Sequence, residues 1–550
     1  MRFLQRNKTP ILLWGVGAGV FFRRVWFSRF DRLMGDGGDV RLISVIHEHW
    51  FQVLRGKAAW RDPYFYYPQK NVLGYTDTFL LNQVFFAPLR ALGVERFLAL
   101  QLTFILMTAV GFAGMVALLR RVTSLSDLPI GLIAASGVFA NAMAVKSDHP
   151  QTQYVYILPW IALLWIGPRS GQHRKRSMFL AGLLAGLLLF SGFYVGWFSL
   201  FALGLFTPIH HFVREYVTPS ADRTWQLLGA SFSQLISGAA GFVLVLVPFW
   251  LTYGPVAGNA DTQPISEPLS YAPKPLDVLN LGPDNLVWRS TLRSVAANHE
   301  LRLSFGEVTM SLTPGITVLF VGATLYLFWI RRFRPSQRDA KVDVAATAAL
   351  TAILLRCIPM QLQNRLPLWS IAHAYIPGAK AIRAIDRLQL LNLVISAVVI
   401  GLAIDHFLRT RESTKRRRAA TVLSVVLAVC LFEQTNVGSF SRIERSEQLA
   451  LLEAVPKPPA SCDSFFLTNR SGPRAFAIHN TEAMSIAYAI GLPTLNGYSG
   501  QAPEDYSPDP ELADHIQRIK RWAARNRLEN VCALERTTLT WTEQPWTSVP

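Results

Sequence analysis

The chain has 550 residues, of which 51% are hydrophobic and only 16% are charged, with a mean hydropathy of +0.26. Soluble domains usually carry about 25% charged residues, so this composition excludes an ordinary soluble globular protein. The formal net charge is +18, but Lys and Arg gather in short segments between apolar runs. That distribution is typical of the topology signals of membrane proteins, and nucleic acid is not needed to explain the charge.

Apolar runs of membrane-spanning length recur along the first 434 residues. A helix needs about 20 apolar residues to cross the hydrocarbon layer, and "FLALQLTFILMTAVGFAGMVALL" (97–119) is such a run without a charged residue. We therefore predict an all-α polytopic membrane protein. Its predicted spans, about eleven in number, are 9–27, 97–119, 128–146, 153–167, 178–193, 194–210, 227–253, 311–330, 342–360, 388–408 and 419–434.

The first predicted span contains two charged side chains. Arg23 and Arg24 follow its apolar part directly, and a charge at the bilayer centre costs about 2.5–3.5 kcal/mol on insertion scales. These arginines either reach outward to the interface or face a polar cavity.

The connections between spans predict the orientation of the chain. Lys and Arg concentrate in every second connection, whereas the short turn at 147–152 holds none. The positive-inside rule then predicts a cytoplasmic N-terminus. The basic segments are 1–8, 120–127, 168–177, 211–226, 331–341 and 409–418.

Two domains follow from this topology. Residues 1–434 form the predicted transmembrane domain, including a first outer loop at 28–96, and residues 435–550 form a small extracytoplasmic α/β domain. Cys462 and Cys532 are the only cysteines outside predicted spans. An oxidising compartment would permit a disulfide between them, and two unrelated thiols are the alternative. In a bacterium the chain would lie in the cytoplasmic (inner) membrane.

The first outer loop begins with "MGDGGDVRLISVIHEHWFQVLRG" (34–56). Gly37 and Gly38 interrupt the preceding structure, and Asp39 can cap a following helix. The apolar side chains then recur at helical spacing, so we predict an amphipathic helix lying in the outer membrane interface. They are Leu42, Ile43, Ile46, Trp50, Val53 and Leu54.

Asp36 lies in the same glycine-rich turn, at the membrane boundary. A carboxylate there could accept a proton from a hydroxyl nucleophile as a general base, or hold a divalent cation beside a phosphate. An ordinary polar turn at the end of a span is the alternative.

An aromatic segment follows at 60–80, "WRDPYFYYPQKNVLGYTDTFL". Aromatic faces beside amides and carboxylates suit sugar rings, whereas the simpler interpretation is an interfacial aromatic belt. The candidate sugar-binding residues are Trp60, Tyr64, Tyr66, Tyr67, Asn71 and Asp77. The nearby His47-Glu48-His49 lacks the H-E-x-x-H spacing of a zinc site.

Two further outer segments add polar groups. The turn "KSDHPQTQ" (146–153) contains Asp148 and His149. The segment "GAKAIRAIDRLQLLN" (378–392) contains Lys380, Arg383 and Arg387, of which the two arginines are four residues apart and would share a helix face. Such basic groups could hold a lipid phosphate. Contact with ordinary lipid headgroups is the alternative.

Several of these segments together resemble one family. "GDGGDVRL", "DPYFYYPQKNVLGYTDTFL", "SDHPQTQYVYILPW", "IPGAKAIRAIDRLQ" and "GLPTLNGYSGQAP" (491–503) are similar to bacterial members of the C-type glycosyltransferase superfamily (GT-C). The resemblance implies a multi-span enzyme with a polyprenyl-phosphate-linked sugar donor and a catalytic carboxylate early in the first outer loop. By that resemblance Asp36 or Asp39 activates the acceptor.

The sequence has Asp-Gly-Gly-Asp where the family has an Asp-Glu or Asp-x-Asp pair. The choice between Asp36 and Asp39, and any need for a divalent cation, therefore stay open. No other cofactor is indicated.

The predicted function is an inverting hexosyl or pentosyl transfer on the outer face of the membrane. The expected partners are the lipid-linked donor and membrane lipids; the acceptor is not identified. A transporter or flippase is an alternative, because Lys146, Arg356 and Asp405 lie within or beside spans, although no internal repeat supports it. A non-catalytic membrane scaffold is the other alternative.

Overall fold

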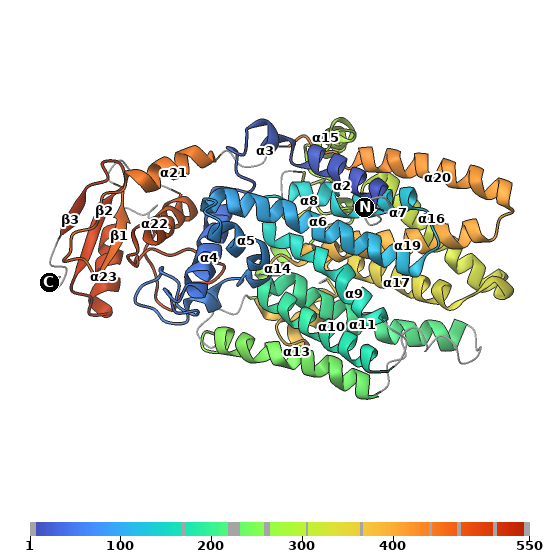
Figure 1. The fold of residues 1–550 in the computed structure, drawn as a ribbon, viewed down its shortest axis with the longest axis horizontal. Helices are drawn as coiled ribbons and strands as arrows, with labels where there is room; N and C mark the ends of the chain where they lie inside the picture. Colours follow the sequence, from blue (N-terminus) through green and yellow to red (C-terminus); the bar gives the residue numbers. More distant parts are fainter. Residues whose placement is uncertain are drawn as a thin grey trace.

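The computed structural model describes residues 7–167, 171–217, 232–257, 264–303, 306–362, 367–438, 443–469, 475–509 and 514–543. Most of these residues are helical. Figure 1 shows long helices running roughly along the longest axis of the molecule, with a small unit of strands and helices at one end. We call that unit the tail, the end of the bundle beside it the tail end, and the opposite end of the bundle the far end.

The helix bundle coincides with the apolar runs of the sequence. Every predicted span overlaps a helix, because an apolar segment in a low-dielectric environment must satisfy its backbone hydrogen bonds internally. The bundle helices are α2 (Lys8–Phe21), α3 (Arg23–Phe27), α6 (Arg96–Val122), α7 (Asp127–Val138), α8 (Asn141–Val145), α9 (Leu158–Ile166), α10 (Gly171–Ser191), α11 (Phe193–Val217), α13 (Phe232–Tyr253), α16 (Pro314–Phe333), α17 (Ala340–Cys357), α19 (Leu390–Arg409) and α20 (Ser413–Glu433).

Among the described residues, six helical segments are both long and apolar enough to cross a membrane. They are Arg96–Val122, Asp127–Val145, Phe193–Val213, Phe232–Tyr253, Pro314–Phe333 and Ile385–Arg409. The predicted number of about eleven spans is therefore not confirmed. The other predicted spans fall on helices that are short, such as α9, or that begin in charged residues, such as α10 with "HRKR" and α20 with "KRRR".

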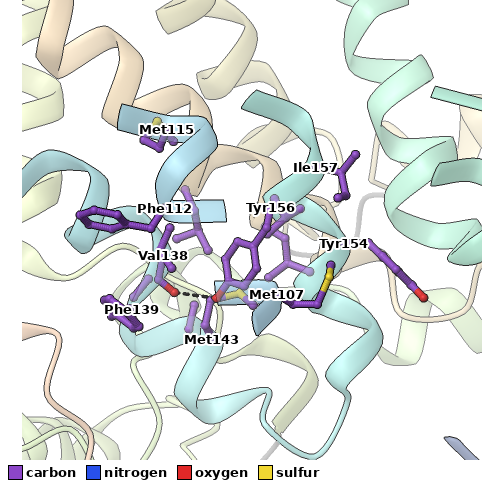
Figure 2. Packing of buried hydrophobic residues seen from close by; sticks show 14 of the residues in the cluster. Met107, Phe112, Met115, Val138, Phe139, Met143, Tyr154, Tyr156 and Ile157 are labelled. Carbon is purple, nitrogen blue, oxygen red and sulfur yellow. Dashed lines mark hydrogen bonds between the residues drawn. The ribbon is translucent and has the colours of Figure 1, made fainter. Parts of the chain in front are cut away.

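Buried side chains hold α6, α7 and η3 (Pro150–Ile157) together at the centre of the bundle. Tyr156 packs over Gly111 of α6, where a Cβ atom would come within 2.5 Å of the ring. Its hydroxyl donates a 2.6 Å hydrogen bond to the carbonyl of Val138 (Figure 2). This packing fixes the turn at 146–149, which joins α8 to η3.

Short helices in the connections complete the tail end of the bundle. They are α4 (Asp39–Leu54), η1 (Val72–Tyr75), η2 (Leu80–Asn82), α5 (Gln83–Ala91), α14 (Ser266–Ser270), η4 (Pro275–Leu279), α15 (Arg289–Asn298), η5 (Gly306–Val308), α18 (Trp369–Tyr375), η7 (Ala379–Ala381) and η8 (Ile385–Gln389). At the far end, η6 (Pro335–Gln337) joins α16 to α17.

The tail contains a three-stranded sheet of order β1-β2-β3, with β1 (Ser464–Thr468) parallel to β2 (Val531–Glu535) and β3 (Trp541–Glu543) antiparallel to β2. Its helices are α21 (Arg445–Ala454), α22 (Phe476–Ile490) and α23 (His515–Arg525). Cys462 and Cys532 form a disulfide with their Cα atoms 5.7 Å apart, the pairing that the sequence left open. The mixed helix and strand content agrees with the predicted α/β character.

Helix α4 occupies a different environment from the predicted one. Its residues from Val40 to Phe51 are all buried, and it packs between the tail helix α22 and the bundle helices α5 and α6 (Figure 1). Arg41 pairs with Glu482 of α22 at 3.4 Å, and Glu48 pairs with Arg90 of α5 at 2.8 Å. The polar face that was expected to meet water instead meets two protein partners.

Candidate active site

Asp36 and Asp39 exchange the roles that the sequence suggested for them. Helix α4 begins at Asp39 itself, and the Asp36 carboxylate accepts hydrogen bonds from the backbone N–H groups of Gly38 (3.1 Å) and Asp39 (2.5 Å). Asp36 therefore satisfies the free amides at the helix start. Desolvation and the neighbouring Asp39 carboxylate raise the pKa of Asp36. The Asp39 side chain is left to make contacts beyond its own helix.

Those contacts reach into the turn that follows α8. One Asp39 oxygen (Oδ2) lies 2.6 Å from Nδ1 of His149. The other ring nitrogen, Nε2, lies 3.3 Å from Glu307. An imidazole between two carboxylates satisfies both only as the doubly protonated cation. Burial and the nearby Arg387 act against that cation, but the hydrogen bonds to Asp39 and Glu307 outweigh them and raise the pKa of His149.

Glu307, in η5, is the centre of this cluster. Besides His149 it accepts from Lys146 Nζ at 3.0 Å, and from Arg387 Nε at 3.0 Å and Nη2 at 2.8 Å. Burial opposes its ionisation, yet the hydrogen bonds from His149 and Arg387 hold the pKa of Glu307 well below its usual range. No motif or spacing in the sequence pointed to Glu307.

The tail also contributes to the cluster. Tyr498, in the "GLPTLNGYSGQAP" segment, donates from its hydroxyl to Oδ1 of Asp39 over 3.4 Å. Burial and the adjacent Asp39 carboxylate raise the pKa of Tyr498, so the hydroxyl keeps the proton that it donates. Gly38 permits the close approach of the tail helix α22, because a Cβ there would lie 3.0 Å from the Cβ of Ala477. We call Asp39, Lys146, His149, Glu307, Arg387 and Tyr498 the acid–base cluster.

A small cavity adjoins the cluster on the side of Arg387. Its volume is about 10 Å³, roughly one water, and it is lined by Asp77, Gln151, Thr152, Gly192, Tyr194 and Arg387 among others. Asp77 accepts a 2.8 Å hydrogen bond from the backbone N–H of Phe193, and burial raises the pKa of Asp77 to about 6. The sequence placed Asp77 in a sugar pocket with the aromatic residues; the structure places it beside Arg387.

Arg383 and Arg387 converge, although not along one helix as expected. Arg387 belongs to η8, whereas Arg383 precedes that helix. Both instead meet Tyr194 of α11: its hydroxyl accepts from the Arg383 backbone N–H at 2.8 Å, and its ring lies 5.6 Å from the Arg387 guanidinium. The Arg383 side chain is exposed and lies 3.6 Å from Glu267, and Lys380 is also exposed.

The aromatic residues predicted to bind sugar lie between the loop and the tail. Tyr66 is buried against Tyr506, with ring centroids 4.6 Å apart, and Tyr64 stacks on Tyr488 at 4.8 Å. The carbonyl of Tyr67 accepts from the Trp522 indole at 2.9 Å. Trp60 packs near Trp50, at 6.5 Å, and Asn71 binds Asp62 through its backbone. These contacts pack the aromatic segment against the tail, and sugar binding by these residues stays a prediction.

The sequence left open whether Asp36 and Asp39 hold a divalent cation. Asp39 and Asp148 are both close enough to Asp36 to help raise its pKa, and Asp148 Oδ1 is buried without a hydrogen-bond partner in the described part of the chain. However, no group of three His, Cys, Asp or Glu side chains closes on a common point within that part. Asp36 and Asp39 therefore lack a third such ligand among the described residues.

The chain is similar to several solved structures, although its sequence matches no protein-family profile and no curated protein. Among solved structures, an Archaeoglobus fulgidus oligosaccharyltransferase complexed with zinc and sulfate matches with a TM-score of 0.49 and 11% identity, over 96% of this chain and 67% of that one. The mycobacterial arabinofuranosyltransferase AftD matches with a TM-score of 0.48 and 14% identity, over 96% of this chain and 35% of that one.

A third match is ArnT from Cupriavidus metallidurans bound to undecaprenyl phosphate, with a TM-score of 0.36 and 13% identity, over 89% of this chain and 85% of that one. These neighbours are GT-C glycosyltransferases. That is the superfamily the sequence resembles. The identities are 11–14% and the TM-scores are below 0.5, so these likenesses do not assign a function. A function has to be inferred from the contacts around Asp39.

Proposed function

We propose that this protein is a membrane glycosyltransferase that moves a sugar from a polyprenyl-phosphate donor to an acceptor hydroxyl at the tail end of the bundle. The observation that carries the proposal is the chain of contacts from Asp39 through His149 and Glu307 to Arg387. In this chain the Asp39 carboxylate is not used to cap α4 and lies close to the cations of the cluster. The chain lies at the tail end of a helix bundle that contains apolar spans.

Asp39 is the proposed general base. Asp36 is occupied with the start of α4, whereas the Asp39 side chain is 17% exposed and faces the cluster. As the acceptor oxygen attacks C1 of the donor sugar, its proton passes to Asp39. The new C1–O bond forms while the bond from C1 to the phosphate oxygen breaks, which inverts the configuration at C1. His149 holds Asp39 in position, and such a positioned base contributes about 10²–10⁴ in rate.

Arg387 is the proposed anchor of the leaving phosphate. Two of its three nitrogens bind Glu307, and Nη1 has no hydrogen-bond partner among the described residues. Arg383, whose backbone N–H binds the same Tyr194, and Lys380 have exposed side chains and supply further positive charge as the polyprenyl phosphate departs. Preorganised cations that meet a developing negative charge are a major source of catalysis.

The proposed orientation places the tail outside the cytoplasm. The disulfide between Cys462 and Cys532 suits an oxidising compartment. The basic clusters at 120–121 and 331–332 end α6 and α16, and that at 415–418 begins α20; these helix ends lie away from the tail (Figure 1), where the positive-inside rule expects the cytoplasm. In a bacterium the active face would then be the outer face of the inner membrane.

The charged residues that suggested a transporter are engaged in pairs near the ends of the bundle. Lys146 binds Glu307 at 3.0 Å, Arg356 lies 3.5 Å from Asp386, and Asp405 lies 3.1 Å from Arg409. A transport path needs polar groups near the bilayer midplane. These contacts favour the transferase.

The test is a transfer assay in reconstituted proteoliposomes with radiolabelled polyprenyl-phosphate pentoses and hexoses and a lipid extract as the acceptor source. We expect Asp39→Asn to lower transfer at least about 100-fold. Asp36→Asn is the matched control: its amide oxygen can still accept from the Gly38 and Asp39 backbone, so most of the rate is retained. Full transfer by Asp39→Asn, or movement of intact donor across the membrane without transfer, would overturn the proposal.

A further inference from the structure

Among the described residues, Arg23 and Arg24, the charged pair of the first predicted span, have backbone partners only. Arg23 donates to the carbonyls of Val20 (3.1 Å) and Asn436 (2.6 Å), and Arg24 donates to that of Val437 (2.6 Å). Neither forms an ion pair with a carboxylate in the described part of the chain. Each guanidinium carries five N–H donors, so both retain positive charge and unused donors.

Arg23 lies at the polar end of an apolar pocket between α2, the α7–α8 segment and α20. The pocket volume is about 240 Å³, larger than a cavity of about 150 Å³ that accommodates benzene. Its apolar wall includes Leu13, Val16, Val20, Phe139, Leu431 and Phe432, and its polar end includes Ser147 and Asn436.

The pocket opens sideways toward the surroundings of the bundle. Val16, Val20 and Phe432 line it and are 56%, 43% and 60% exposed, on helices whose outward side chains are apolar. In a bilayer, lipid chains are the direct neighbours of such side chains. A hydrocarbon chain therefore reaches the pocket without crossing water.

The pocket and the acid–base cluster share one wall. In the turn after α8, Lys146 and His149 point toward Glu307, at 3.0 and 3.3 Å, whereas Ser147 between them lines the pocket. The arginines thus lie near the same boundary of the bundle as the cluster, on the other side of this turn.

We propose that this pocket binds an anionic phospholipid of the surrounding bilayer, with one acyl chain between α2 and α20 and the phosphate on Arg23 and Arg24. Arginine binds phosphate oxygens through charge-assisted hydrogen bonds, and basic pockets between transmembrane helices select anionic headgroups. The bound phospholipid would brace α2 against the segment 435–438 and so support the wall behind His149. This binding does not depend on the transferase activity.

The test uses the delipidated full-length protein in detergent, titrated with phosphatidylglycerol or phosphatidylcholine and followed by native mass spectrometry. We expect one phosphatidylglycerol to bind with about tenfold preference over phosphatidylcholine. The double variant Arg23→Gln/Arg24→Gln should lose about tenfold in phosphatidylglycerol affinity. Arg23→Lys/Arg24→Lys, which keeps the charge, should retain more of it, and Arg29→Gln, an exposed arginine of the next turn, should bind like the wild type. Unchanged binding by the Gln double variant would overturn the proposal.

A second arm tests the chain-binding part and does not involve the arginines. Ala428 is exposed on α20 and lines the pocket, whereas its neighbour Val429 is exposed and does not. Ala428→Trp should fill the pocket and lower phosphatidylglycerol binding about tenfold, and Val429→Trp should leave it unchanged. Equal binding by both would contradict the proposal. Complete displacement by inorganic phosphate alone, or by polyprenyl phosphate at lower concentration than phosphatidylglycerol, would also overturn it.

Discussion

Two groups of buried charges at opposite ends of the bundle follow the same plan. At the far end, Asp343 of α17 is held by Arg331 of α16 and by Arg338 at 2.7 Å. At the tail end, Glu307 is held by Lys146, His149 and Arg387. In each, one carboxylate is surrounded by cations, which limits the desolvation penalty of burying them.

The two groups differ in their origin along the chain and in what surrounds them. The far-end group joins one helical hairpin, since Arg331 and Asp343 are twelve residues apart. The tail-end group gathers five distant segments and contains a second carboxylate, Asp39, whose contacts are a histidine and a tyrosine. A local, closed ion pair serves to hold helices together, whereas a group assembled from distant segments with a partly exposed carboxylate is suited to chemistry.

The largest effect on stability should come from breaking the far-end group. Asp343→Asn removes the carboxylate that pairs with the buried Arg331, and removing one partner of a buried pair destabilises by about 3–5 kcal/mol. We expect a much lower melting temperature in detergent with unchanged transfer per folded molecule. Glu412→Gln, which breaks the exposed pair with Lys415, should change stability by less than about 1 kcal/mol. Equal melting of the two variants would remove the structural role assigned to Asp343.

Glu307→Gln should affect both stability and chemistry. It replaces the charged acceptor of Lys146, Arg387 and His149, and a hydrogen bond to a charged group contributes about 1.5–3 kcal/mol. The hydrogen bond from His149 to Glu307 helps to raise the His149 pKa, so the variant should lower that pKa. We expect the pH–rate profile of transfer to shift to lower pH, measured at equal folded fraction. An unshifted profile would show that Glu307 is structural only.

The positions of the helices along the chain were largely predictable, but the surroundings of each helix were not. Each apolar run became a helix, because apolar length and hydrogen-bond satisfaction are local properties. Helix α4 has the periodicity of an interfacial helix, yet the same periodicity serves a helix between a bundle and a tail. Only the partners Glu482 and Arg90 distinguish the two.

The residues of the candidate site were also only partly predictable from the sequence. Asp39, His149 and Arg387 were singled out by residue type and position; Asp39 contacts His149 directly, and Arg387 joins them through Glu307. Glu307 was not, because the loop 254–310 also carries Glu267, Asp277, Asp284 and Glu300, and packing alone selects which carboxylate reaches Arg387. The contacts of Tyr64 and Tyr66 with the tail were not predictable from the sequence, because their partners, Tyr488 and Tyr506, lie more than 400 residues away.

Asp77→Asn should change how stability depends on pH. Burial raises the Asp77 pKa to about 6 in the folded protein, against an unfolded value near 3.9. A raised folded pKa gives stability that is complete below the unfolded value and is lost as pH rises through the folded value. The wild type should therefore lose stability between about pH 4 and pH 6 from this residue. Asp77→Asn, which can still accept from Phe193, should flatten that slope in melting curves; an unchanged slope would contradict the assignment.

The smallest expected effect is that of the tail on the site. Tyr498→Phe removes the donor to Asp39, a long hydrogen bond worth about 0.5–1.5 kcal/mol. Transfer should fall about threefold to tenfold with an unchanged melting temperature, while Tyr375→Phe, at a fully solvent-facing position, should leave the rate unchanged. A wild-type rate in Tyr498→Phe would limit the tail to a packing role.

The central claim is that Asp39 and Arg387 act on different steps at one site. The most direct measurement pairs the equilibrium affinity for a labelled polyprenyl-phosphate sugar with its single-turnover transfer rate, for the wild type, Asp39→Asn and Arg387→Lys in the same proteoliposomes. We predict that Asp39→Asn binds the donor normally and transfers at least about 100-fold more slowly, while Arg387→Lys binds it about tenfold more weakly. Normal transfer by Asp39→Asn together with normal donor binding by Arg387→Lys would contradict the account.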